Sequence, residues 1–125
     1  MGLDMFAYKA QNFQPSKPVD FQDELPSEVE EFFYWRKHPD LQGWMQKLYR
    51  AKGGADESFN SSPVVLTMED LDNLENDVRQ HKLPETQGFF FGKSYGDEME
   101  RDLDFIDQAR RAIKDGYTVY YSSWW

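Results

Sequence analysis

The chain has 125 residues, of which 39% are apolar and 17% aromatic, enough for one domain whose core is built largely from rings. It carries 23 acidic and 14 basic residues, a formal net charge of −9, and this surplus of negative charge argues against general binding to a phosphate backbone. It contains no cysteine, which excludes disulfides, thiolate metal ligands and cysteine nucleophiles, and no apolar run approaches the roughly 18 residues that span a bilayer.

The first 30 residues predict a short strand followed by an irregular segment. Asp4–Lys9 is apolar enough for a strand, and a strand so close to a chain end needs a partner to stay ordered. Residues 11–30, which we call the arm, are polar and contain three prolines, so they favour an irregular arm or long loop. Because 125 residues fit a single core, we expect one domain, 1–125, that includes the arm.

A dense aromatic run predicts a second strand. Four consecutive rings favour an extended conformation, so we predict a strand over Glu31–Lys37. Ser27 and Glu30 have the spacing of a helix capping box, which leaves a helix start there as the alternative. A helix then begins at Pro39, where the missing N–H is harmless, and Gly53–Gly54 ends it.

The second half of the chain predicts two strands and two helices. Residues 63–66, a proline and three aliphatic residues, predict a buried strand. Thr67 and Asp70 have capping-box spacing, so a helix begins there. Residues 97–115 carry acids in their first turns and bases in their last, and a glycine follows, which is typical of a helix. Alternation over residues 117–122 predicts the last strand.

About four strands and three helices therefore make up the predicted domain. The expected fold class is α+β, a single two-layer domain in which about three helices pack on one face of a small mixed β-sheet.

Motifs for catalysis and metal binding are weak in this sequence. Residues 88–94 end in Gly-Lys-Ser, but only three residues, all phenylalanine, separate the glycines where a phosphate-binding loop has four. His38 and His81 have no carboxylates at metal-ligand spacing, and the acids of residues 97–104 suit a solvated helix face. We therefore expect no catalytic residue, no metal and no cofactor, and an enzyme of unknown reaction is the third choice of function.

One constellation of rings and cations stands out in the acidic chain. Arg36 and Lys37 follow the aromatic run, and glycine-flanked phenylalanines and serines near the C-terminus repeat the mixture. Arginine pairs with anions and also lies flat on rings, so the combination predicts a pocket for a small anionic, nucleotide-like ligand or a peptide. In a strand the two cations point to opposite faces, so only one enters a given pocket. The candidate ligand-binding residues are Tyr34, Trp35, Arg36, Lys37, Trp44, Thr86, Phe90 and Ser123.

A packing explanation competes with the ligand site. In it the rings form the core, and the two cations pair with some of the 23 acids. For the phenylalanines we favour packing. For Arg36, Lys37 and Ser122–Trp124 the two explanations stay balanced, because these residues are too polar or too close to the chain end for packing alone.

Several motifs, in the same order along the chain, resemble those of a known family. They are the opening residues 1–8, the run 34–37 with Gly43-Trp44 downstream, residues 83–86 leading into 88–92, and the closing residues 120–124. In these motifs the chain is similar to small, generally uncharacterised proteins of bacteriophages and prophages. Some members carry the label phosphoglycerate kinase, which a chain this short without a nucleotide loop does not support. The chain departs from the family in its longer arm and in His38-Pro39-Asp40, where the family pattern has Ala-Asn, so a site using that asparagine is altered here.

Two functions from different classes follow. The first is a phage-type accessory protein that binds the small anionic ligand without catalysis, for sequestration or counter-defence. The second is an acidic protein-binding module that uses residues 97–104 to inhibit or redirect a host factor. Under either function we expect a soluble protein of the host cytoplasm that does not enter membranes, and so many rings would also suit a homodimer interface.

Overall fold

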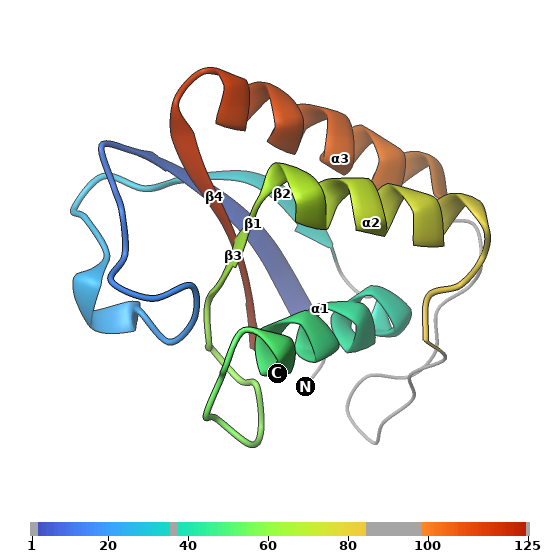
Figure 1. Ribbon diagram of the computed structural model, residues 1–125, viewed down its shortest axis with the longest axis horizontal. Helices are drawn as coiled ribbons and strands as arrows, with labels where there is room; N and C mark the ends of the chain where they lie inside the picture. Colours follow the sequence, from blue (N-terminus) through green and yellow to red (C-terminus); the bar gives the residue numbers. More distant parts are fainter. Residues whose placement is uncertain (1–2, 36–37, 85–98, 125) are drawn as a thin grey trace.

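The computed structural model describes residues 3–35, 38–84 and 99–124, and over these ranges it shows a four-stranded sheet with three α-helices and one short 3-10 helix (Figure 1). The predicted site residues Arg36, Lys37, Thr86 and Phe90 lie outside the described residues. In chain order the elements are β1 (Asp4–Gln11), η1 (Gln22–Glu24), β2 (Glu30–Trp35), α1 (Pro39–Ala51), β3 (Val64–Leu66), α2 (Met68–Arg79), α3 (Met99–Lys114) and β4 (Tyr117–Trp124).

Neighbouring strands of the described sheet all pair antiparallel, in the order β2-β1-β4-β3. The α+β class is confirmed, and the sheet is antiparallel where the sequence predicts a mixed one. The connection between β3 and β4 shows why. The two helices α2 and α3 carry the chain along the sheet and back, so β4 returns antiparallel to β3. A parallel neighbour would need a single crossover, such as one helix.

The three helices cover one face of the sheet, and the main core lies between the two layers (Figure 1). Because side chains alternate along a strand, Met5 and Ala7 of β1 and Tyr121 of β4 all point into this core and are fully buried. The helices contribute the buried apolar residues Leu41, Met45, Tyr49, Leu71, Leu74, Val78, Phe105, Ile106, Ala109 and Ala112.

A bulge in the β1–β2 pair breaks this alternation. The register shifts between Ala7 and Tyr8, so two residues of β2 stand against one position of β1. As a result Phe32 and Phe33, although adjacent, both reach the ring of Phe105 in α3, with centroid separations of 6.0 and 5.5 Å. The predicted aromatic strand therefore exists, and its rings pack mainly as core.

The arm packs against the opposite face of the sheet (Figure 1). Phe13 and Phe21 are buried there, and the Phe21 ring meets Tyr120 of β4 edge to face at 5.3 Å. A bridge between Val19 and Val64 fastens the arm to the start of β3. The predicted irregular arm is thus a long loop with one short helical turn, held in place by two buried rings.

Local signals fix the helix ends as predicted. The Thr67 hydroxyl accepts a hydrogen bond from the Asp70 N–H, and the Asp70 carboxylate accepts one from the Thr67 N–H, which completes the capping box. Pro39 is the first residue of α1. Beyond α1 and α3, Gly53 and Gly116 have φ angles of +96° and +93°, a left-handed conformation that glycine adopts without steric penalty.

Candidate functional site

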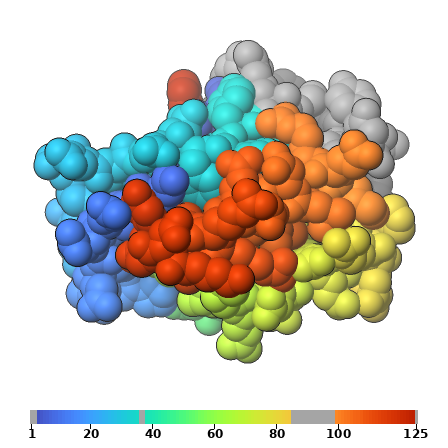
Figure 2. All heavy atoms as spheres, turned by 90° about the horizontal axis from the view of Figure 1, so that it is seen from above, coloured from blue at the N-terminus to red at the C-terminus, as the bar shows by residue number. Residues whose placement is uncertain are grey.

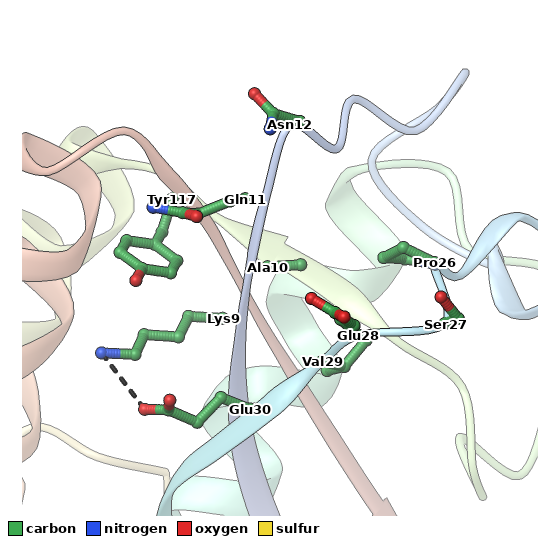
Figure 3. A pocket seen from close by; sticks show the side chains of 10 residues that line it. All are labelled: Lys9, Ala10, Gln11, Asn12, Pro26, Ser27, Glu28, Val29, Glu30 and Tyr117. Atoms are coloured by element: carbon green, nitrogen blue, oxygen red, sulfur yellow. Dashed lines mark ion pairs between the residues drawn. The ribbon is translucent and has the colours of Figure 1, made fainter.

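β1 and β2 separate at one end of the sheet, and a hollow opens between them. Their ladder ends at the pair Lys9–Glu30, whereas β1 continues along β4 to the pair Gln11–Tyr117. The last part of the arm, which leads into β2, diverges from β1 and leaves a space of about 570 Å³, which we call the first hollow (Figure 3). Its lining residues are Lys9, Ala10, Gln11, Asn12, Pro26, Ser27, Glu28, Val29, Glu30 and Tyr117.

The ammonium group of Lys9, which lines the first hollow, contacts one carboxylate and two aromatic rings. Lys9 Nζ lies 3.3 Å from Glu30 Oε2, 4.7 Å from the centroid of the Tyr117 ring and 5.9 Å from that of Phe32. Figure 3 shows Lys9 and Tyr117 on one side of β1 and the Glu28 carboxylate on the other. Contacts of an ammonium with a ring face are worth about 0.5–1 kcal/mol at exposed sites. The chain itself therefore supplies a bound cation here.

A second hollow of about 390 Å³ adjoins the first, with Pro26, Ser27 and Val29 lining both. We call the two hollows together the cleft. Its second part lies on the sheet face away from the helices, over Tyr8 and Tyr120, whose rings stack at 5.1 Å with an interplanar angle of 24°. The lining residues of the second hollow are Tyr8, Gln22, Leu25, Pro26, Ser27, Val29, Glu31, Ser61, Pro63, Tyr120 and Ser122.

The cleft lies at one end of the molecule. In Figure 2 the arm and the segment leading into β2, in blue and cyan, lie beside the C-terminal end of α3, in red. Three carboxylates, those of Glu28, Glu30 and Glu31, line the cleft against the single ammonium of Lys9. The cleft therefore has the same sign of charge as the chain as a whole.

The two tyrosines under the second hollow keep their protons at neutral pH. Burial raises the pKa of Tyr8, and the neighbouring Glu31 carboxylate raises it further. Burial, with a smaller contribution from Tyr8, raises the pKa of Tyr120 to about 12. Both side chains thus offer neutral rings, whose faces are electron-rich, and hydroxyl groups that donate and accept hydrogen bonds.

A separate polar cluster is buried under the helices. Asp102 of α3 accepts a hydrogen bond from Trp35 Nε1 at 3.3 Å, and its second oxygen lies 2.8 Å from His38 Nε2. The side chains of all three residues are almost completely buried. The expectation that the acids of residues 97–104 form a solvated face is therefore wrong for Asp102, because it points inward to satisfy the indole and the imidazole.

A buried amide in the same core lacks one hydrogen bond. The Tyr121 hydroxyl donates to Gln42 Oε1, while Gln42 Nε2 is buried without a partner among the described residues. Burial raises the pKa of Tyr121 well above its usual range, so this hydroxyl stays protonated. Leaving a buried donor unpaired costs about 1–3 kcal/mol.

The structure describes four of the predicted site residues, and two of them, Trp35 and Ser123, stand on either side of Met5 in neighbouring strands. Trp35 is 2% exposed and packs on Phe105, and Ser123 is 1% exposed. Tyr34 is 37% exposed and donates a hydrogen bond to Asp4. Trp44 donates from Nε1 to Asp77 Oδ2 of α2 at 2.8 Å. With Arg36, Lys37, Thr86 and Phe90 outside the described residues, the pocket predicted around them stays a prediction.

The sequence gives no signal for the cleft as a whole. Tyr8, Glu31 and Tyr120 stand side by side across three strands, but they are far apart along the chain. The sequence shows which residues of one strand share a face, because side chains alternate along it. It does not show which residues of neighbouring strands stand opposite one another. The buried His38 and Asp102 pair, which are 64 residues apart, escapes sequence reasoning for the same reason.

Comparisons with known proteins leave the site without a precedent: no family model, no curated protein and no solved structure matches the chain. Among the residues that the structure describes, no group of three or more His, Cys, Asp or Glu side chains is arranged to hold a metal ion. The described helices also include none that is both long and apolar enough to span a membrane.

Proposed function

We propose that the protein acts by binding a ligand in the cleft. The observation that carries this proposal is the pair of adjoining hollows, of about 570 and 390 Å³, between the sheet and the arm. Ligand sites in proteins measure about 300–1,000 Å³ and combine apolar walls with a few convergent polar groups. The cleft has rings and prolines in its walls and hydroxyls and carboxylates among them.

The proposed biological role is that of a phage-type accessory protein. The support is the resemblance in sequence motifs to small bacteriophage proteins, together with a cleft that the arm helps to form. The arm is one of the two segments by which the chain departs from that family's pattern, and it is the one that lines the cleft. We therefore assign ligand choice to the arm and the general fold to the rest of the chain.

A second candidate is the anionic ligand predicted from Arg36 and Lys37. Its support among the described residues is Gln42 Nε2, a buried donor without a hydrogen-bond partner in the core that also holds Trp35. A ligand held there would accept a hydrogen bond from it. Binding of that kind would perturb the core at Trp35 and leave the cleft unchanged.

Nuclear magnetic resonance distinguishes these sites. The labelled protein is titrated with a panel of nucleotides, sugars, amino acids, small amines and short peptides while the backbone amide signals are followed. We expect a panel member to shift the amides of Ala10, Val29 and Tyr120, which line the cleft. Shifts confined to Trp35 and Ser123 would support the second candidate, and a panel that moves no cleft amide would overturn the proposal.

Two matched variants of the arm test whether the cleft itself is responsible. Ser27 lines both hollows and is exposed, so Ser27→Trp fills the cleft without disturbing the core. Gln14 is also exposed and lines neither hollow, so Gln14→Trp places the same ring on the arm away from the cleft. We expect Ser27→Trp to abolish the shifts and Gln14→Trp to retain them. Equal binding by both variants would contradict the proposal.

A further inference from the structure

Glu31, Tyr8 and Tyr120 form one row across the face of the sheet under the second hollow. Tyr8 of β1 pairs with Glu31 of β2 on one side and with Tyr120 of β4 on the other. Directly opposed side chains on neighbouring antiparallel strands have Cβ atoms about 4.5–5.5 Å apart. A carboxylate and two neutral rings are therefore presented together on the floor and wall of one cavity.

The first hollow shows what such a combination holds. There a carboxylate, Glu30, and a tyrosine ring, Tyr117, enclose the ammonium of Lys9. The second hollow repeats the carboxylate and the tyrosine ring but has no lysine or arginine among its lining residues. Glu31 forms no ion pair within the part of the chain that the structure describes. The second hollow thus has a carboxylate and tyrosine rings that could bind a cation, but no cationic side chain of the chain lines it.

The charges in the second hollow also exclude an anion as its natural ligand. Glu31 is the one charged residue among those that line it, and the chain carries a net charge of −9. An anion placed there would meet like charge and electron-rich ring faces with no basic group to pair with. A cation would meet favourable interactions with the same groups.

We propose that the second hollow binds an organic cation, a guanidinium or primary ammonium group on an apolar stem. The inference rests on the proposed function, because it names the ligand class of the same cleft. The charged head lies between Glu31 and the ring of Tyr8. The stem lies along Leu25, Pro26 and Val29, which supply apolar wall on the side of the arm. Serine hydroxyls and the Gln22 amide oxygen accept the remaining N–H groups.

Isothermal titration of the full chain tests the inference with four probes. Agmatine and spermidine present the cation on a free small molecule, a capped tetrapeptide Gly-Arg-Gly-Gly presents it on a peptide, and ATP is the anionic comparison. We expect the cationic probes to give a saturable heat of binding and ATP to give none. Because a charge contact at a partly exposed site is screened, binding weakens when sodium chloride is raised from about 0.02 M to about 0.5 M.

Two charge-neutralising variants separate a specific site from general attraction to an acidic protein. Glu31→Gln removes the carboxylate of the second hollow, and Glu69→Gln removes an exposed carboxylate of α2 that lines neither hollow. We expect Glu31→Gln to weaken binding of the cationic probes by roughly fivefold and Glu69→Gln to leave it within error. Tyr8→Leu, which keeps bulk but removes the ring, weakens binding by a similar factor.

The outcomes are distinguishable. Tighter binding of the peptide than of agmatine indicates a partner protein as the source of the cation, and the reverse order indicates a free amine; both support the inference. Equal effects of Glu31→Gln and Glu69→Gln overturn it. If only anionic or neutral panel members shift the cleft amides, the inference fails while the proposed function stands. If no compound shifts them, both fail.

Discussion

Asp102 connects three elements of the fold through one buried side chain. Its two oxygens join Trp35 at the end of β2 and His38 at the start of α1 to a single position on α3. A carboxylate that is only 1% exposed is stable there because both of its oxygens have hydrogen-bond partners. One residue thereby fixes where three elements meet.

Removing the Asp102 carboxylate takes away the acceptor of the buried Trp35 N–H and one buried partner of His38 Nε2. We expect Asp102→Ala to lower the free energy of unfolding by about 3–5 kcal/mol, the range for breaking a buried pair from one side. Asp104→Ala on the same helix is the control, because Asp104 is exposed and its loss should change stability by less than about 0.5 kcal/mol. Urea unfolding of the two variants measures the difference. Equal losses would contradict the role given to Asp102.

Asp56 links stability to pH through the loop between α1 and β3. Its carboxylate accepts hydrogen bonds from the Ser62 hydroxyl and from Ser58, and these bonds hold the pKa of Asp56 below its usual value. A group whose pKa is lowered by folding adds stability above its unfolded pKa, near 3.9, and loses it as pH falls through the folded value. The contribution of Asp56 is therefore complete at neutral pH and disappears in acid.

The corresponding prediction concerns the acid limb of the stability curve. Asp56→Asn should lower stability at pH 7 and should make stability fall less steeply than in the native chain below about pH 4. Glu57→Gln, the exposed neighbour, serves as the control and should leave the curve's shape unchanged. Thermal unfolding followed from pH 7 down to about pH 2 gives both curves. A parallel displacement of the Asp56→Asn curve at every pH would refute the linkage.

At the scale of elements, the sequence predicts well those helices whose ends are set by nearby residues. The proline that begins α1, the capping box of α2 and the glycines after α1 and α3 act over a few residues, so they can be read without knowing the fold. The predicted strands are also present, with ends that differ by a few residues. The antiparallel pairing was missed because it depends on how α2 and α3 return the chain.

The cleft was beyond prediction for a related reason. It exists because the segment before β2 departs from β1 after the pair Lys9–Glu30 and because the arm folds back over Tyr120. Both events depend on contacts between distant parts of the chain. Of the predicted ligand residues, Trp35 and Ser123 are both buried on the helix side of the sheet, because both pair with Met5 of β1. The alternation that points each side chain inward can be read from the sequence.

The arm as an element depends on the ring of Phe21. Phe21 is 1% exposed and packs on both Phe13 and Tyr120. Phe21→Ala should destabilise the protein by about 3 kcal/mol or more, and hydrogen exchange should speed up most for the amides of residues 13–24. Leu25→Ala is the control, because Leu25 is 38% exposed. Uniformly faster exchange across the helices instead would show that the arm is not a separate packing unit.

At the scale of the whole molecule, the two faces of the sheet are covered by different parts of the chain. The face under the helices is occupied by the main core, and the arm packs on the opposite face (Figure 1). The second hollow lies on that opposite face as well, over Tyr8 and Tyr120. The net charge of −9 attracts cations to the protein surface in general. The row of Glu31, Tyr8 and Tyr120 provides the one specific site that we propose for them. We therefore expect the organic cation to bind on the face of the sheet that the helices do not cover.

The most direct test of the proposed cation site is a crystal structure of the protein with agmatine. We expect the guanidinium or ammonium head in the second hollow, within hydrogen-bond distance of the Glu31 carboxylate and against the Tyr8 ring. Agmatine bound to other acidic side chains, such as those on α3, with the cleft empty, would contradict it.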